Sequence, residues 1–129
     1  MIPEHILFVK NINNLNALSV NKAWRGGPRY RTADYKSYEE VIWAHIGRQS
    51  KAFDGPVQVD LAFHFKYAGK RDVDNPIKPI LDILVKLNYL KDDTQVQRLV
   101  VSKCHALEDS IYIAIKKLDS NESHFCSKV

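Results

Sequence analysis

Residues 57–65 read Val-Gln-Val-Asp-Leu-Ala-Phe-His-Phe, and apolar side chains occupy every second position from Val57 to Phe65. Successive side chains of a strand point to opposite faces, so this alternation predicts a strand with one buried face. The apolar run in residues 5–10 also favours a strand. Residues 95–104 and 111–115 are strand-like as well, and their closeness in sequence predicts an antiparallel hairpin.

Two segments have the periodicity of amphipathic helices. Residues 76–88 follow Asp74-Asn75, which provides a capping residue, and begin with Pro76 at the first helical position. The other segment is residues 33–49. Its predicted buried stripe consists of Tyr38, Val41, Ile42, His45 and Ile46.

The element order strand, helix, strand, helix, strand, strand predicts an α+β fold in which one mixed β-sheet carries two helices on one face. The 129 residues suffice for a single domain, expected over residues 1–118, with a polar C-terminal tail over residues 119–129. The two cysteines give neither a disulfide framework nor a paired zinc spacing. No apolar stretch is long enough for a membrane span, and no secretory signal is recognisable, so a cytoplasmic protein without a membrane partner is expected.

Basic residues are concentrated in residues 22–36. The whole chain has a formal net charge of +4, and this segment alone has five basic residues against one acidic residue. Gly26-Gly27-Pro28 at its centre predicts a loop, and aromatic residues flank that loop on both sides. Such a loop suits a polyanion, because cations pair with phosphates and rings stack on exposed bases, although solvated surface loops are often basic too. The DNA contacts expected from it are Lys22, Arg25, Arg29, Arg31 and Lys36.

Acidic residues precede the second predicted helix. Asp72 and Asp74 lie in an extended stretch, where side chains two residues apart point to the same side. Two such carboxylates repel each other unless a cation lies between them, so the spacing favours a divalent ion. Hard oxygen ligands select Mg²⁺ or Mn²⁺ rather than zinc. Lys78, on the first turn of the helix, is near enough to reach back over this site and stabilise a phosphate.

Asp92-Asp93, beyond the same helix, are candidates for a third carboxylate. If the next strand lies beside residues 57–65, these acids approach Asp72 and Asp74 only when the connection returns to the C-terminal end of that strand, as an antiparallel pairing would allow. Each residue also has a simpler role. Asp74 can cap the helix, Asp92-Asp93 can form a solvated turn, and Lys78 can be an ordinary exposed lysine.

Together these residues resemble the motif of the RusA family of Holliday-junction resolvases, which phages and prophages often carry. The family pattern is R-D-x-D-N, a lysine four residues after the second aspartate, a helix, and then D-D-x-Q-V. The sequence has Arg71-Asp72-Val73-Asp74-Asn75, then Lys78, then Asp92-Asp93-Thr94-Gln95-Val96. The resemblance covers roughly residues 5–117 and is looser in the N-terminal half. Pro76 and Pro79 at the helix start depart from the family pattern.

The resemblance implies a homodimeric, Mg²⁺-dependent endonuclease that makes paired nicks in four-way DNA junctions and leaves 5′-phosphates. It assigns the metal-binding aspartates to Asp72, Asp74 and Asp93, and the catalytic lysine to Lys78. Lys70 and Arg71, next to these acids, are expected to contact DNA as well. A two-fold symmetric junction requires two active sites, which a C2 dimer provides.

Two other functions compete with this one. A non-catalytic DNA-binding module with a structural acidic cluster would use the same basic loop, but it does not need three carboxylates beside a phosphate-binding surface. A phosphotransfer enzyme that uses D-x-D to hold a nucleotide diphosphate is disfavoured, because 129 residues leave little room for a nucleotide-binding domain.

Overall fold

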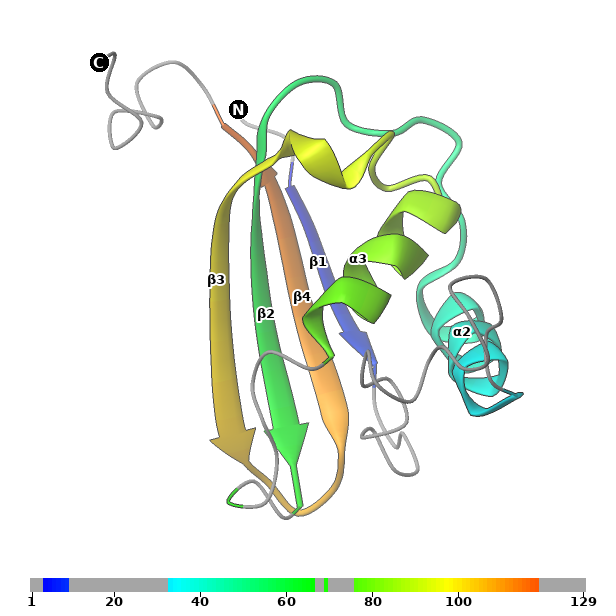
Figure 1. Ribbon diagram of the computed structural model, residues 1–129, viewed down its shortest axis with the longest axis vertical. Coiled ribbons are helices and arrows are strands. Elements are labelled where there is room, and N and C mark those ends of the chain that lie inside the picture. Colours follow the sequence, from blue (N-terminus) through cyan, green and yellow to red (C-terminus); the bar gives the residue numbers. More distant parts are fainter. Residues whose placement is uncertain (1–3, 10–32, 67–68, 70–75, 119–129) are drawn as a thin grey trace, which may run out of the picture.

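The computed structural model describes residues 4–9, 33–66, 69 and 76–118. One sheet and two helices form an α+β fold (Figure 1), which confirms the predicted fold class and element order. The predicted tail, residues 119–129, lies outside the described residues. The elements are β1 (Glu4–Val9), α2 (Ala33–Ile46), β2 (Val57–Phe65), α3 (Ile77–Lys86), the 3₁₀ helix η3 (Asp93–Gln95), β3 (Val96–His105) and β4 (Ser110–Lys117).

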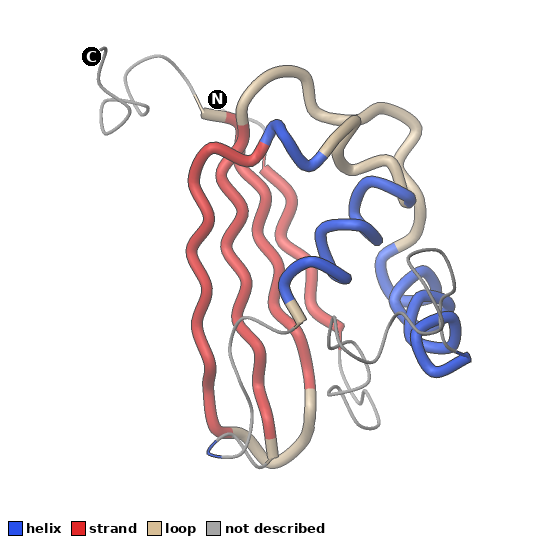
Figure 2. The backbone as a smooth tube through the Cα atoms, viewed as in Figure 1, coloured by secondary structure: helices blue, strands red, loops and turns tan. Residues whose placement is uncertain are grey.

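The strands lie in the order β1-β4-β2-β3, so β4 and β2 are central (Figure 2). β4 is antiparallel to both β1 and β2, whereas β3 is parallel to β2. The predicted hairpin of β3 with β4 is therefore wrong, because β2 lies between them. The connection between β3 and β4 crosses the end of β2, where the backbone N–H of Ala106 donates to the Phe65 carbonyl at 3.0 Å and that of Lys66 donates to Asp109 Oδ1 at 2.9 Å.

Composition explains which strands are central. β4 reads Ser-Ile-Tyr-Ile-Ala-Ile-Lys-Lys, and only its last two residues depart from a nearly continuous buried run. β3 instead exposes Gln97, Ser102 and Lys103. A strand with such polar and charged side chains is better placed at a sheet edge, where it discourages pairing with other chains.

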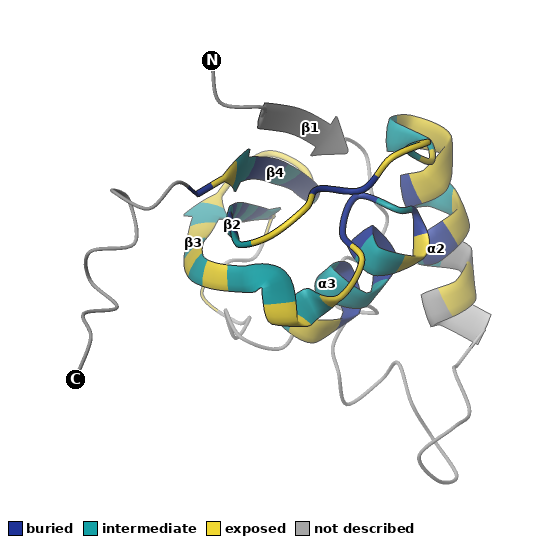
Figure 3. Ribbon diagram, turned by 90° about the horizontal axis from the view of Figure 1, so that it is seen from above, coloured by how far each residue is buried: buried dark blue, intermediate teal, exposed yellow. Residues whose placement is uncertain are grey.

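A single hydrophobic core lies between the sheet and the helices (Figure 3). β2 buries every second residue from Val57 to Phe65, as its alternation predicts. α3 adds Ile80 and Leu84 to the same cluster, and α2 adds Ile42, so both helices pack on one face of the sheet as expected. Each of these fully buried side chains contributes roughly 1.5–3 kcal/mol of transfer free energy.

α2 differs from its prediction in its end and in its buried face. It ends earlier than expected, at Ile46, because Gly47 has a φ of +69° and takes the left-handed conformation common just after a helix. His45, which was expected on the buried stripe, is exposed. Glu39 is buried instead, and its carboxylate pairs with the ammonium of Lys86 on α3 at 2.5 Å. This ion pair is what allows an acidic side chain to face the core.

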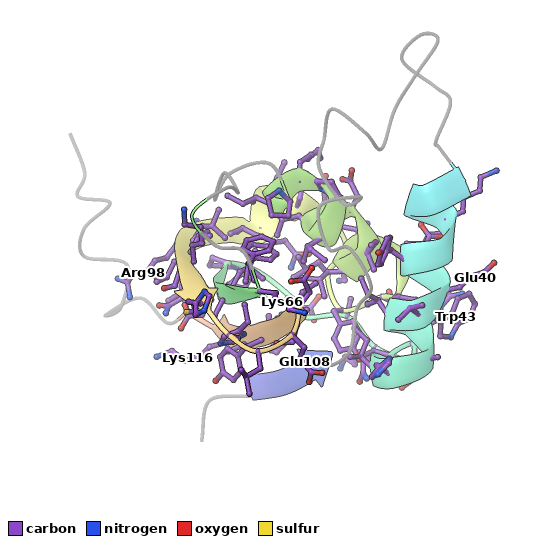
Figure 4. All side chains as sticks on the ribbon, turned by 90° about the horizontal axis from the view of Figure 1, so that it is seen from below. Glu40, Trp43, Lys66, Arg98, Glu108 and Lys116 are labelled. Atoms are coloured by element: carbon purple, nitrogen blue, oxygen red, sulfur yellow. The ribbon has the colours of Figure 1, made fainter. Side chains whose placement is uncertain are left out.

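The faces of the sheet and of α2 that lie away from the core carry polar side chains together with a few exposed apolar ones. Glu40 and Trp43 project from the side of α2 that faces away from the sheet (Figure 4). On the uncovered face of the sheet, Gln58 donates to Asp60 at 2.8 Å and accepts from Arg98 at 3.0 Å. Neither described helix has the length and apolar character that crossing a membrane would require.

The start of α3 also differs from its prediction. The helix begins at Ile77, and Pro76 occupies the cap position with φ −86° and ψ 0°. The prediction that Pro76 is the first helical residue is therefore wrong, because Pro76 occupies the cap and the helix begins one residue later. Asp74 lies outside the described residues. Pro79 is tolerated because the first turn of a helix does not require its missing N–H.

Candidate active site

Two of the predicted catalytic residues, Lys78 and Asp93, are described by the structure, and they are in contact. Asp72 and Asp74 lie outside the described residues. Lys36 is exposed in the first turn of α2, which agrees with a surface role. The other predicted DNA contacts also lie outside the described residues: Lys22, Arg25, Arg29, Arg31, Lys70 and Arg71.

Lys78 lies between two carboxylates. Its Nζ atom is 2.5 Å from Asp93 Oδ2, on η3, and 2.8 Å from Asp82 Oδ1, one turn further along α3. The side chains of Asp82 and Asp93 are about one-third exposed and that of Lys78 is 55% exposed, so this group is accessible to solvent. We call Lys78, Asp82 and Asp93 the acid–lysine cluster.

The charges of the acid–lysine cluster stabilise one another. Hydrogen bonds to Asp82 and then to Asp93 raise the pKa of Lys78, against a small opposing effect of burial. The hydrogen bond from Lys78 lowers the pKa of Asp93. Lys78 and Asp93 are therefore held charged near neutral pH, and the ammonium remains available as a fixed positive charge.

The contact between Lys78 and Asp93 arises from a βαβ unit. β2, α3 and β3 form two parallel strands joined by a helix, and Asp93 lies just before β3, at the end of the sheet where β2 begins. The predicted condition for Asp93 to approach Asp72 and Asp74, a return of the chain to the C-terminal end of β2, is not met, because β3 is parallel to β2 and begins beside Val57. The contact of Asp93 with Lys78 depends instead on the short length of the helix between the strands. α3 is only about 15 Å long, from its 10 residues and a rise of 1.5 Å each. It lies along the half of the sheet nearest η3 (Figure 1), so a long side chain on its first turn reaches Asp93.

The two adjacent aspartates have different roles. Asp92 is the cap of η3: its Oδ1 accepts from the backbone N–H of Thr94 at 3.3 Å, while Gln95 Oε1 accepts from the backbone N–H of Asp92 at 3.1 Å. This reciprocal pair is a capping box. The Asp92 carboxylate thus accepts a hydrogen bond from the backbone of the turn itself, whereas the Asp93 carboxylate accepts one from Lys78.

Sequence reasoning missed Asp82 and Gln95. The signal for Asp82 was its position four residues after Lys78, which places the two side chains side by side on a helix. The signal for Gln95 was the Asp-x-x-Gln spacing of a capping box, Asp92 to Gln95. Both patterns are visible in the sequence.

The acid–lysine cluster provides ligand atoms of the type that divalent metal ions prefer, although a lysine ammonium lies between them. Within residues 4–9, 33–66, 69 and 76–118, no three His, Cys, Asp or Glu side chains gather as a metal site. Asp82 and Asp93 nevertheless direct hard carboxylate oxygens at one cation, the Lys78 ammonium. Mg²⁺ and Mn²⁺ prefer such oxygens. Asp72 and Asp74, which come shortly before α3 in the sequence, are carboxylates of the same kind and lie outside the described residues.

A comparison with curated protein sequences gives no match. The family model described as Endodeoxyribonuclease RusA matches residues 17–116, which include all the predicted site residues, all of α2, β2, α3, η3 and β3, and all but the last residue of β4. The match covers well over half of the chain, and the chain therefore belongs to the RusA family of endodeoxyribonucleases.

Proposed function

We propose that this protein is a Mg²⁺-dependent endonuclease that introduces symmetric nicks into four-way DNA junctions during recombination and repair in the cytoplasm. The observation that carries the proposal is the Lys78 ammonium held between the carboxylates of Asp82 and Asp93 at an accessible position, in a chain of an endodeoxyribonuclease family. The proposed metal ligands are Asp72, Asp74 and Asp93, with Mn²⁺ as a possible substitute.

The fixed charge of Lys78 supports a role at the scissile phosphate. A phosphodiester gains negative charge as it is attacked, and a preorganised ammonium stabilises that charge without having to reorganise. Two aspartates hold the flexible lysine side chain, so part of its conformational entropy is already lost before DNA binds. Lys78 would therefore act by position and charge rather than by accepting a proton, because the raised pKa keeps it protonated.

When bound, Mg²⁺ would supply positive charge to the scissile phosphate and lower the pKa of an attacking water. Asp93 supports this role because its carboxylate is ionised, oriented and only partly buried. Asp92 does not compete with it, since its side chain caps η3.

The substrate is proposed to be branched DNA and the active form a homodimer. The basic segment, residues 22–36, has the charge to hold the DNA backbone through counterion release, and Lys36 is exposed. One active site makes one nick, so paired nicks in a two-fold symmetric junction call for two copies related by a C2 axis.

The test is incubation with a labelled four-way junction and with a linear duplex of the same sequence, each in Mg²⁺ and in EDTA. We expect paired nicks in the junction only, and only in Mg²⁺. Tight junction binding without cleavage in either condition would indicate a non-catalytic DNA-binding module. Equal cleavage of junction and duplex would contradict the junction specificity, and cleavage in EDTA would contradict the metal.

A further inference from the structure

The amide of Gln95 makes four hydrogen bonds, all to backbone groups. Its Oε1 accepts from the N–H groups of Lys91 and Asp92, at 2.6 and 3.1 Å. Its Nε2 donates to the carbonyls of Phe53 and Gly55, at 2.8 and 2.9 Å. A glutamine amide has two donor hydrogens and two acceptor lone pairs, so this side chain uses its full capacity.

These bonds join two segments that are far apart in the sequence. The loop before β2 provides the two carbonyls, and the turn before β3 provides the two N–H groups. The same two segments are also joined by a parallel bridge between Phe53 and Leu90 and by an ion pair between Lys91 and Asp54. The loop before β2 directly precedes a core strand, and its residue Phe53 is buried. The position of this loop is therefore fixed, and its hydrogen bonds can hold the turn in place.

Asp93 directly follows Lys91 and Asp92 in the sequence, the two residues whose backbone N–H groups donate to Gln95. Gln95 fixes the backbone on the N-terminal side of Asp93, and the side chain of Gln95 starts from the C-terminal end of the same short helix. The backbone of Asp93 is thus anchored on both sides by one residue. Its carboxylate then reaches Lys78 Nζ at 2.5 Å.

We propose that Gln95 is a positioning residue for Asp93: its amide clamps the turn at residues 91–95 to the loop at residues 53–55 and so sets where the Asp93 carboxylate lies relative to Lys78. The effect of Gln95 on catalysis rests on the proposed function, whereas its effect on the placement of Asp93 is independent of that function. Groups that orient metal ligands in this way typically change metal affinity or activity by about 10–100-fold when they are removed.

The chain offers two informative variants and a matched control. Gln95→Leu removes all four bonds at similar volume. Gln95→Glu keeps the acceptor oxygen for Lys91 and Asp92 but places a second oxygen against the carbonyls of Phe53 and Gly55, which removes only the attachment to the loop. Gln97→Leu, two residues further on in β3, makes the same substitution at an exposed position.

Three measurements separate positioning from general stability. Thermal unfolding gives the highest temperature at which each variant is still fully folded. Below that temperature, Mn²⁺ binding is measured without DNA, and junction cleavage is measured as a function of Mg²⁺ concentration. We expect Gln95→Leu and Gln95→Glu to bind Mn²⁺ about 10–100-fold more weakly and to need correspondingly more Mg²⁺ for half-maximal cleavage, with Gln97→Leu unchanged. A residue that only stabilised the fold would leave both quantities unchanged once every variant is folded.

A crystal structure of Gln95→Glu, or of Gln95→Leu if that variant crystallises instead, decides the structural part directly. We expect Asp93 Oδ2 to leave hydrogen-bond distance of Lys78 Nζ. An unmoved Asp93, or Mn²⁺ affinity equal to that of the unmodified protein, would overturn the positioning role. If the unmodified protein neither binds Mn²⁺ nor cleaves the junction, the proposed function fails, and the position of Asp93 in the variant structure still decides the role of Gln95.

Discussion

Replacing Lys78 by Met should separate catalysis from stability, because α3 carries a second paired lysine that serves as a control. Lys78→Met keeps most of the side-chain length and removes the charge between Asp82 and Asp93. Lys86→Met does the same to the pair with Glu39, two turns further along the helix. The two substitutions are chemically identical and differ in which carboxylates lose the ammonium.

The stability changes follow from burial. Lys78 is 55% exposed and its partners are about 30% exposed, and exposed ion pairs contribute only about 0.2–1 kcal/mol each. Lys78→Met should therefore lower the free energy of unfolding by about 1 kcal/mol, which is a fall of about 2–5 °C in Tm for a chain of this size. Glu39 is 8% exposed, and depriving a buried carboxylate of this ammonium costs about 1–3 kcal/mol, so Lys86→Met should be the less stable variant.

The activities should follow the opposite order. Removing one preorganised positive group from a developing oxyanion typically slows the reaction by about 10²–10³-fold, and this loss is expected of Lys78→Met alone. The assay is single-turnover cleavage of a four-way junction at a temperature where thermal unfolding shows both variants folded. The reasoning is refuted if Lys78→Met keeps more than about a tenth of the activity, or if Lys86→Met loses as much as Lys78→Met.

Three further outcomes are expected. Replacing Arg25, Arg29 and Arg31 together by Ala should weaken junction binding and reduce the slope of log K against log salt concentration by up to about 0.9 per lost phosphate contact, and an unchanged slope would assign these residues to ordinary surface. Sedimentation of the DNA-free protein at micromolar concentration should show a dimer, and a monomer would contradict a preformed C2 pair. In an NMR titration without metal, Asp93 should titrate below the usual range of aspartate, and Lys78→Met should raise its pKa. Because the folded pKa is the lower one, this stabilisation is present above the ordinary pKa and is lost as the pH falls through the folded value, so the variant should lose less stability in acid.

The elements of the fold were predictable because they depend on local patterns. The alternation of Val57 to Phe65 and the spacing of Ile80, Leu84 and Leu87 each specify a buried face, and the structure buries those faces. The order of the strands was not predictable in this way. It depends on non-local pairing, and the short connection from β3 to β4 suggested a hairpin, although the hydrogen bond from Ala106 to Phe65 carries that connection across β2.

The candidate site was partly predictable for a similar reason. The motif identified Lys78 and Asp93, which the fold brings together. It contains Gln95 but gave that residue no role, and it does not include Asp82, since both roles depend on a partner's position in space: Asp82 shares the ammonium with Asp93, and Gln95 reaches the loop at residues 53–55. The start of α3 was predicted one residue too early, because proline is favoured at the first helical position and Pro76 instead occupies the cap.

Asp92 and Asp93 provide the sharpest comparison for metal-dependent cleavage, because they are adjacent, both acidic, and differ in what their carboxylates contact. Asp92→Asn should keep the cap of η3, since Asn caps about as well as Asp, and should cleave a four-way junction in Mg²⁺ at nearly the rate of the unmodified protein. Asp93→Asn removes a charge that faces Lys78 and the proposed metal, and should reduce cleavage by orders of magnitude while junction binding in EDTA stays the same or becomes tighter. Single-turnover cleavage rates that are equal in the two variants would contradict the proposed active site.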